Sequence, residues 1–250
     1  MSDLPRGSTP PRRVIPPPVI AARGDEQPGN ERSDHGVTRD VGVVIVAGGS
    51  GSRVGSDELK QFRWVVGRPA LLHSVQTFMA RADVSTVVVV LPKAYAADPP
   101  PWLFQCDVDR LLVSVGGRER HESVYNGLED LPEEVRIVVV HDAARPLVTD
   151  ETIERVIAEA RRGHGAVAAL PVVDTLKRVD AGGRIVETVD RAGLWRAQTP
   201  QAFPREMIER AHARRDRRCR TVRATWRTCC RRARIGTRAQ DHRRGRLRAR

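Results

Sequence analysis

Five apolar runs rich in β-branched residues are spaced along the chain, and they restrict it to a small set of folds. The runs cover residues 41–46, 86–91, 111–115, 136–140 and 166–170. Most of them are separated by segments whose apolar residues recur at helical spacing. Short apolar runs that alternate with amphipathic helices are typical of α/β domains. We therefore predict an α/β fold with a mostly parallel central sheet that is flanked by helices.

Two of the predicted helices are defined by their first turns and their apolar faces. One begins at about Pro69, a residue that is well tolerated in a first turn. Its apolar face comprises Leu71, Leu72, Val75, Phe78 and Met79. The other begins at about Asp150, whose charge favours the N-terminal end of a helix dipole. Its apolar face comprises Ile153, Val156, Ile157 and Ala160, and both helices are expected to cover the sheet.

A glycine-rich turn directly follows the first apolar run, in the sequence AGGSGSR that ends at Arg53. Gly48, Gly49 and Gly51 allow backbone N–H groups to approach an anion closely. Arg53 and the nearby Lys60 add positive charge that suits a chain of phosphates. The spacing fits neither G-x-x-x-x-G-K-[ST] nor G-x-G-x-x-G. We favour a nucleotide phosphate site, and a tight turn without a ligand is the alternative.

Two later strand ends carry polar residues that can share this site, because open α/β sheets bind ligands beyond the carboxyl ends of their strands. GGRERHES follows the third run and supplies Gly117 and the hydroxyl of Ser123. HDAARP follows the fourth run and supplies Asp142. A carboxylate beside phosphates requires a cation between the two anions, and Mg²⁺ commonly binds one carboxylate together with phosphate oxygens. The alternative is that Asp142 caps the next turn and pairs with Arg145, while His141 is expected to be a packed side chain.

Six motifs in order resemble those of one enzyme family. They are AGGSGSR at 47–53, LKQF at 59–62, GGRERHES at 116–123, HDAARPL at 141–147, DTLKRV at 174–179 and ETVDRAGLWRAQTPQAF at 187–203. From about residue 41 to 212, the chain resembles the 2-C-methyl-D-erythritol 4-phosphate cytidylyltransferases, which join CTP to methylerythritol phosphate in non-mevalonate isoprenoid synthesis. The resemblance implies a Rossmann-like nucleotidyltransferase fold with a protruding β-arm.

The resemblance also assigns roles to individual residues. The implied nucleotide-binding residues are Ala47, Gly48, Gly49, Gly51, Gly117, Ser123, Asp142, Ala143 and Thr199. The implied catalytic residues are Arg53, Lys60 and Arg191, which would neutralise charge on the α-phosphate and on the departing pyrophosphate. Arg145, Thr175 and Arg191 are implied to bind methylerythritol phosphate, and Asp142 is the implied Mg²⁺ ligand. Direct in-line attack on CTP then needs no covalent enzyme intermediate.

The β-arm of the family maps to residues 172–194. Residues 174–190 alternate around Asp180-Ala-Gly-Gly183, which is typical of a hairpin turn. An isolated hairpin is marginally stable in water and needs another surface. We therefore predict a homodimer that forms through this arm, and an exposed hairpin without a catalytic role is the alternative.

The two ends of the chain fall outside the resemblance. Residues 1–40 are rich in Pro, Arg, Gly and Asp, and we predict a disordered extension before a cytidylyltransferase domain of residues 41–213. Residues 211–250 hold 16 Arg and carry a charge of +14, which leaves −2 for the rest of the chain. We predict that residues 214–250 are a disordered, Arg-rich tail outside the family and interpret them as an out-of-frame reading of the gene. A basic tail for nucleic acid is the alternative.

Three departures from the family pattern bear on function. Leu59 stands where the family usually has Pro, and Gly48 replaces a more usual Ala, as in ribitol-5-phosphate cytidylyltransferases. A ribitol-5-phosphate enzyme is therefore the second candidate function. The third departure is the loss of the family's T-D-[DE] and K-V-T segments, with a Lys near the phosphates. This loss puts activity in question, and it leaves a nucleic-acid-binding protein that acts through the tail as the alternative of another class.

Several classes of protein are disfavoured by composition. Three of the four cysteines lie in the Arg-rich tail, and their spacing fits neither a disulfide framework nor paired zinc ligands. No apolar run is long enough to span a bilayer, and the N-terminus lacks the apolar stretch of a signal peptide. We predict a cytoplasmic enzyme that has no membrane partner and acts on CTP and methylerythritol phosphate, and we disfavour a nucleic-acid partner.

Overall fold

The computed structural model describes residues 19–22, 38–48 and 59–216. The predictions for most of the N-terminal extension, for residues 49–58 and for residues 217–250 lie outside this part of the chain. Within it, each of the five predicted strands and both predicted helices are present. The predicted α/β fold is confirmed.

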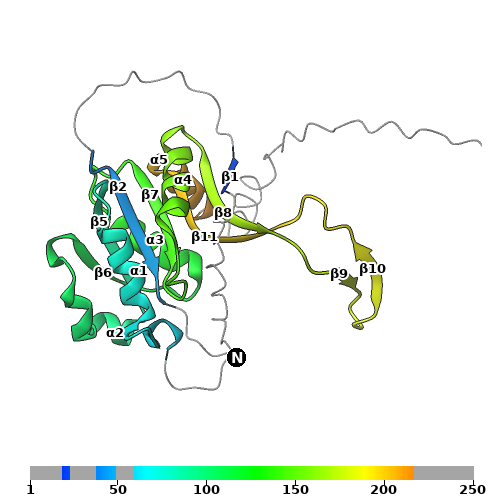
Figure 1. Cartoon of the computed structure of the whole chain (residues 1–250), viewed down its shortest axis with the longest axis horizontal. Coiled ribbons are helices and arrows are strands. Elements are labelled where there is room, and N and C mark those ends of the chain that lie inside the picture. Colours follow the sequence, from blue (N-terminus) through cyan, green and yellow to red (C-terminus); the bar gives the residue numbers. More distant parts are fainter. Residues whose placement is uncertain (1–18, 23–37, 49–58, 217–250) are drawn as a thin grey trace, which may run out of the picture.

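Seven strands form the central sheet in the order β1-β8-β11-β7-β2-β5-β6 (Figure 1). They are β1 (Val19–Ala22), β2 (Val41–Val46), β5 (Val84–Leu91), β6 (Leu111–Val115), β7 (Ile137–Asp142), β8 (Gly165–Pro171) and β11 (Trp195–Pro204). β7, β2, β5 and β6 pair in parallel, and β11 runs antiparallel to both β7 and β8. Because β11 separates them, β7 and β8 point in the same direction, and five of the seven strands are co-directional.

Two strands of the sheet were not predicted from the sequence. β11 lacks an apolar run, and its backbone is held by partners on both sides, β7 and β8. β1 corrects the prediction that residues 1–40 are disordered throughout, because Val19–Ala22 pair antiparallel with residues 165–168 of β8. The open edge of β8 supplies hydrogen-bond partners to this short apolar stretch. Both strands depend on distant partners, which local periodicity does not reveal.

Helices cover the two faces of the sheet. The helices of the sheet layers are α1 (Ala70–Met79), α3 (Arg120–Glu129), α4 (Asp150–Arg161) and α5 (Arg205–Asp216). α1 and α4 pack their apolar side chains on one face and α3 and α5 on the other, so that two apolar clusters flank β2, β5 and β7. The predicted apolar faces of α1 and α4 are buried except for Met79, which is partly buried. A short helix α2 (Lys93–Ala97) and three 3-10 turns, η1 (Lys60–Phe62), η2 (Pro101–Gln105) and η3 (Val108–Arg110), complete this part of the chain.

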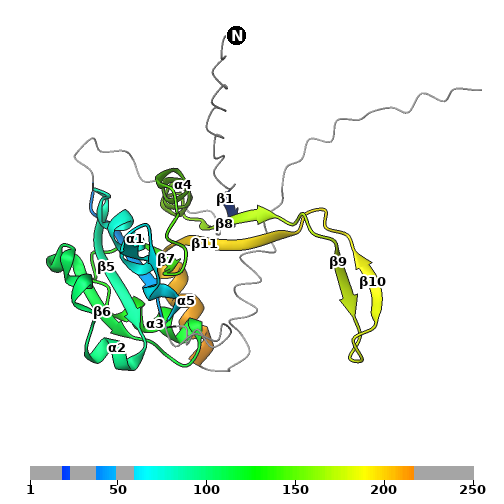
Figure 2. The ribbon, with the colours of Figure 1, turned by 60° about the horizontal axis from the view of Figure 1, so that its bottom comes forward.

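Two small hairpins lie outside the central sheet. One joins β3 (Trp64–Val65) to β4 (Arg68–Pro69), and the other joins β9 (Leu176–Val179) to β10 (Ile185–Val189). The β9–β10 hairpin lies beyond the ends of β8 and β11, away from the sheet, in both views (Figures 1 and 2). Its turn is held by Asp180, whose Oδ1 accepts hydrogen bonds from the N–H groups of Gly182 and Arg184, both at 2.9 Å. The predicted hairpin turn is present, and its role as a dimer arm stays a prediction.

Candidate functional site

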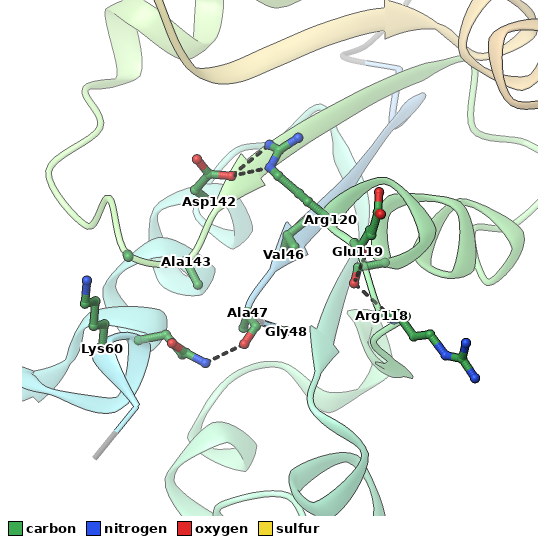
Figure 3. Close-up of a pocket in the computed structure, with 13 residues that line it drawn as sticks. Val46, Ala47, Gly48, Lys60, Arg118, Glu119, Arg120, Asp142 and Ala143 are labelled. Atoms are coloured by element: carbon green, nitrogen blue, oxygen red, sulfur yellow. Dashed lines mark hydrogen bonds and ion pairs between the residues drawn. The ribbon is translucent and has the colours of Figure 1, made fainter. Parts of the chain in front are cut away.

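A pocket of about 590 Å³ opens where the parallel strands β2, β6 and β7 end (Figure 3). It is lined by Val46, Ala47, Gly48, Lys60, Gln61, Gly117, Arg118, Glu119, Arg120, Ser123, Asp142, Ala143 and Ala144. Parallel strands bring their carboxyl ends to one edge of the sheet, where ligands of such folds bind. Residues from four of the motifs, AGGSGSR, LKQF, GGRERHES and HDAARPL, therefore line one pocket, and the roles assigned to them stay predictions.

The Lys60 segment is attached to the first strand end through Gln61. The Gln61 side chain is buried, and its Nε2 donates a hydrogen bond to the carbonyl of Ala47. The N–H of Ala47 in turn donates to the carbonyl of Val90 at 2.9 Å, which fixes the end of β2 against β5. Lys60 remains exposed on the pocket wall, on the side opposite Glu119 in Figure 3. The LKQF motif thus places an exposed ammonium group on the same pocket wall as Ala47 and Gly48.

Gly48, at the end of the first strand, packs against the Gly116–Gly117 turn around Ser123. A Cβ on Gly48 would lie 3.3 Å from Ser123 Oγ, and a Cβ on Gly116 would lie 3.4 Å from the Cα of Gly48. Ser123 Oγ accepts a hydrogen bond from the N–H of Gly117 at 3.1 Å and donates to the carbonyl of Glu119 at 3.3 Å. The Ser123 hydroxyl therefore connects the Gly116–Gly117 turn to the N-terminal end of α3, on the pocket wall.

The start of α3 is capped by Glu122. Its Oε2 accepts hydrogen bonds from the N–H groups of Arg118 at 2.7 Å and Glu119 at 3.3 Å. These are backbone donors at a helix start that have no partner within the helix. The cap closes the GGRERHES loop over Gly117, and it fixes the directions in which the arginines of this motif leave the backbone.

Asp142, at the end of β7, carries most of the charge contacts in the pocket. Its Oδ1 accepts from Arg120 Nε at 3.0 Å and Arg120 Nη2 at 2.7 Å, and its Oδ2 accepts from Arg145 Nε at 3.2 Å. Burial alone would raise the pKa of Asp142, but Arg120 and Arg145 together hold that pKa below its ordinary value. The N–H of Asp142 donates to Thr199 Oγ1 at 3.1 Å, which links β7 to β11. Asp142 is thus an ionised carboxylate with two cationic partners.

His141 is fully buried and packs edge-on against Phe78, as expected of a packed side chain. Its Nε2 lies 3.1 Å from the carbonyl of Arg145. Since a carbonyl only accepts, Nε2 carries the proton, and Nδ1 is left buried without a partner. Burial lowers the pKa of His141 to about 4. The neutral ring thereby fixes the turn that presents Asp142 and Arg145.

The stability of the fold is expected to fall as the pH is lowered from about 6.5 towards 4. The folded state keeps His141 neutral down to a pKa of about 4, whereas the unfolded chain takes up the proton near 6.5. Stability is therefore lost as pH falls through this window, by up to about 1.4 kcal/mol per pH unit. Urea unfolding at pH 7, 6 and 5 measures the loss, and His141→Gln should show a smaller one. Burial also lowers the pKa of His212, which contributes to the loss in both proteins. The test is therefore the difference between wild type and variant. Equal losses of stability in the two would show that His141 is not the cause.

The other predicted site residues fall into two groups. Gly49, Gly51 and Arg53 lie outside the described residues. The second group is described by the structure but does not line the pocket, and it comprises Arg145, Thr175, Arg191 and Thr199. Arg145 and Thr199 nevertheless bond directly to Asp142, whereas Thr175 and Arg191 flank the β9–β10 hairpin. The roles assigned to all of these residues stay predictions.

Sequence reasoning missed two residues that shape the pocket. Arg120 lies within a motif that was recognised, but a sequence does not show which of its two arginines turns towards the strand end. In the structure the Arg120 side chain crosses to Asp142, while the Arg118 side chain extends away from Asp142 (Figure 3). Gln61 was likewise present in a recognised motif, and its burial beneath Ala47 depends on a contact 14 residues away.

Comparisons with known sequences agree on one family. The family model described as "IspD: 2-C-methyl-D-erythritol 4-phosphate cytidylyltransferase" matches residues 41–225. A protein of that name from Ralstonia nicotianae is 47% identical over 181 residues, covering 68% of this chain and 71% of the relative. Another from Syntrophus aciditrophicus is 39% identical over 175 residues, covering 69% and 74%. The "Bifunctional enzyme IspD/IspF" of Rhodospirillum rubrum is 46% identical over 178 residues, but the match spans only 44% of that longer protein.

Solved structures give the same result. The 2-C-methyl-D-erythritol 4-phosphate cytidylyltransferase of Thermus thermophilus has a TM-score of 0.57 and 34% identity, and the match covers 71% of this chain and 77% of that one. The Francisella tularensis protein of the same name has a TM-score of 0.59 and 27% identity, with 71% and 78% covered. Fold and sequence therefore agree over the same two thirds of the chain.

Proposed function

The chain belongs to the 2-C-methyl-D-erythritol 4-phosphate cytidylyltransferase family, and from that premise we propose that it transfers a cytidylyl group from CTP to 2-C-methyl-D-erythritol 4-phosphate. The products would be 4-diphosphocytidyl-2-C-methyl-D-erythritol and pyrophosphate, in non-mevalonate isoprenoid synthesis. The family match does not favour the alternatives of a ribitol-5-phosphate enzyme or a nucleic-acid-binding protein.

The observation that carries the proposal is the meeting of the motif residues in one pocket. Ala47, Gly48, Lys60, Gly117, Ser123 and Asp142 come from four separate motifs, and all of them line the same cavity. Gly117 and Ser123 offer close backbone approach and a hydroxyl on one side, and Lys60 offers a positive charge on the other. A nucleotide has a matching distribution, with a neutral base at one end and a polyanion at the other. We assign the base to the Gly117–Ser123 side and the phosphates to the Lys60 side.

The residues present fit a Mg²⁺ ion that is shared with the substrate. Within the described residues, no cluster of three or more His, Cys, Asp or Glu side chains could hold a metal by itself. Asp142 is ionised and lies on the pocket wall. Mg²⁺ requires few protein ligands, because phosphate oxygens and water complete its octahedron. Asp142 would be its protein ligand, and the bound ion would neutralise charge on the triphosphate.

The proposed reaction is a direct in-line displacement. An oxygen of the methylerythritol phosphate attacks the α-phosphorus of CTP, a new P–O bond forms, and the bond from the α-phosphorus to the bridging oxygen of the β-phosphate breaks. The electron pair leaves with pyrophosphate. Two anions must approach, so the protein has to align and neutralise them. Lys60 would stabilise the α-phosphate and pyrophosphate, together with Arg53.

The β9–β10 hairpin connects binding of the second substrate to dimer formation in this proposal. Thr175 and Arg191 flank a hairpin that lies away from the central sheet of its own chain (Figure 2). Val179, Ile185 and Val186 on this hairpin are each more than half exposed, and an isolated hairpin needs a further surface. We propose that the hairpin packs on a second copy and delivers Thr175 and Arg191 to the partner's pocket. Sedimentation velocity that shows only monomers at micromolar concentration would rule this out.

The function is tested by pyrophosphate release from the full chain. Release is expected only when CTP, methylerythritol phosphate and Mg²⁺ are all present, and ATP should not replace CTP. Ribitol 5-phosphate in place of methylerythritol phosphate separates the two candidate substrates, since activity with ribitol 5-phosphate alone would contradict the proposal. Absence of release with either substrate would remove the transferase function for this chain.

No helix in the described part of the chain combines the length and apolar character that a membrane span requires. A cytoplasmic location stays a prediction from the sequence.

A further inference from the structure

Arg120 bonds to the carboxylate of Asp142, the residue proposed above as the Mg²⁺ ligand. Two of its nitrogens, Nε and Nη2, donate to the same carboxylate oxygen at 3.0 and 2.7 Å. The other oxygen is engaged by Arg145, which lies only three residues away and also bonds to Gln198. Arg145 is therefore a local partner on the same turn, whereas Arg120 reaches across from another element. A ligand that approaches Asp142 from the pocket must compete with Arg120.

The ion pair between Arg120 and Asp142 is partly exposed, and such pairs break with little loss of free energy. The side chains of Arg120 and Asp142 are 42% and 31% exposed, and ion pairs that reach the surface contribute little to stability because water competes for both charges. By contrast, Arg81 and Asp83 at the opposite end of the sheet are 13% and 6% exposed, and breaking a buried pair of that kind leaves a charge in the interior without its partner. The difference indicates that the Arg120 contact can be exchanged while the buried pair cannot.

The place of Arg120 on α3 also argues against a purely structural role. It is the first residue of the helix, where a positive charge is unfavourable because the helix dipole is positive there. A residue chosen for helix stability at this position would be neutral or acidic. The cation is tolerated because an anion, the carboxylate of Asp142, faces it. A triphosphate in the pocket would also place negative charge opposite Arg120, and it carries more negative charge than one carboxylate.

We propose that Arg120 is a positioning residue that is exchanged on nucleotide binding: it neutralises Asp142 in the ligand-free protein and turns to the phosphates when CTP arrives with its metal ion. Asp142 is then released to bind the metal. Because Arg120 starts the helix that carries Ser123, the exchange links the base side of the pocket to its phosphate side. This proposal rests on the proposed function, in that CTP is the nucleotide.

The test is Mn²⁺ binding to the full chain in the absence of nucleotide, followed by the EPR signal of free Mn²⁺. In Arg120→Gln the competing cation is removed, and Mn²⁺ alone should bind about 10-fold more tightly than to wild type, which corresponds to ~1.4 kcal/mol. Binding of CTP in the presence of Mn²⁺ should instead weaken about 10-fold, because a charge-assisted contact to phosphate is lost. If Arg120 only held the pocket in shape, its replacement would weaken both Mn²⁺ binding without nucleotide and CTP binding with Mn²⁺.

Three further variants complete the test. Arg118→Gln removes the same charge from the same loop. Arg118 also lines the pocket, but its side chain extends away from Asp142 (Figure 3), whose arginine partners are Arg120 and Arg145, so the Mn²⁺ affinity of this variant without nucleotide should equal that of wild type. The double variant Arg120→Gln with Asp142→Asn should lose the gain. Arg120→Lys keeps the charge without the two-nitrogen contact, and its Mn²⁺ affinity should lie between those of wild type and Arg120→Gln. This variant tests the proposal independently if Arg120→Gln folds poorly.

The proposal is overturned if Mn²⁺ alone binds Arg120→Gln and Arg120→Lys no more tightly than wild type, or if Arg118→Gln shows the same gain. These outcomes do not depend on turnover. A gain in Mn²⁺ affinity in a chain without transferase activity would leave the exchange at Asp142 standing and would refute only the proposed function.

Discussion

Replacing Lys60 by alanine is expected to lower kcat about 100- to 1,000-fold, with a smaller change in the KM for CTP. Lys60 lies on the pocket wall, and its proposed role is to stabilise charge that grows as pyrophosphate departs. Interactions of this type act more strongly on the transition state than on the bound substrate, and loss of one donor costs about 2.7–4 kcal/mol. Steady-state kinetics of pyrophosphate release measure the effect.

Lys93→Ala is the matched control for this experiment. Lys93 is an exposed lysine at the start of α2 and does not line the pocket, so kcat should stay within about twofold of wild type, as for most surface substitutions. An unchanged kcat in Lys60→Ala would remove this residue from the mechanism. A raised KM with an unchanged kcat would assign it to ground-state binding instead.

Replacing Gly117 by alanine is expected to damage the pocket more than the fold. The new Cβ would lie 2.3 Å from the Cβ of Glu122 and 2.9 Å from its Oε2. No rotation relieves a clash with a Cβ, so the start of α3 must move, and the cap that Glu122 makes to Arg118 and Glu119 is disturbed. Crowding of this kind costs about 1–3 kcal/mol of unfolding free energy, whereas a displacement near 1 Å at a reacting site can lower activity about 100-fold.

Two measurements separate these effects, urea unfolding and pyrophosphate release. Gly182→Ala is the control glycine, because its Cβ would lie 3.4 Å from Asp180 Oδ1, an ordinary contact, and its stability should change by less than about 0.5 kcal/mol. If Gly117→Ala folds and reacts like wild type, the close packing of Gly117 against Glu122 is not what shapes the pocket.

The strands and the first helices follow from local pattern, as particular elements show. The uninterrupted run at β2 predicts a strand covered on both faces, and Val41, Val43, Val44 and Ile45 are all fully buried. β11 lacks such a run and is a strand because β7 and β8 flank it. β1 likewise takes its conformation from the edge of β8. Patterns predict an element when its own side chains decide its burial, and they fail when partners distant in sequence decide it.

The candidate site divides in the same way. The motifs alone place Gly48, Gly117, Ser123 and Asp142 at strand ends, because residue type and position after an apolar run are enough for that inference. They do not show that Ser123 is bonded to Gly117 and Glu119. The pairing of Asp142 with Arg145 was anticipated as an alternative, but the motifs do not show that Arg120 bonds to the same carboxylate.

By itself, the sequence determined the α/β class, the strand ends that carry chemistry and the family to which they belong. These depend on short-range features: β-branched runs, glycines that permit close approach, and charged residues at fixed spacing. Only the tertiary structure decided that Arg120, rather than Arg118, meets Asp142, and that the packed His141 side chain leaves its Nδ1 unpaired. The direction of a side chain depends on the packing of elements far apart in the chain, and that packing exists only once the sheet has brought β2, β6 and β7 to a common edge.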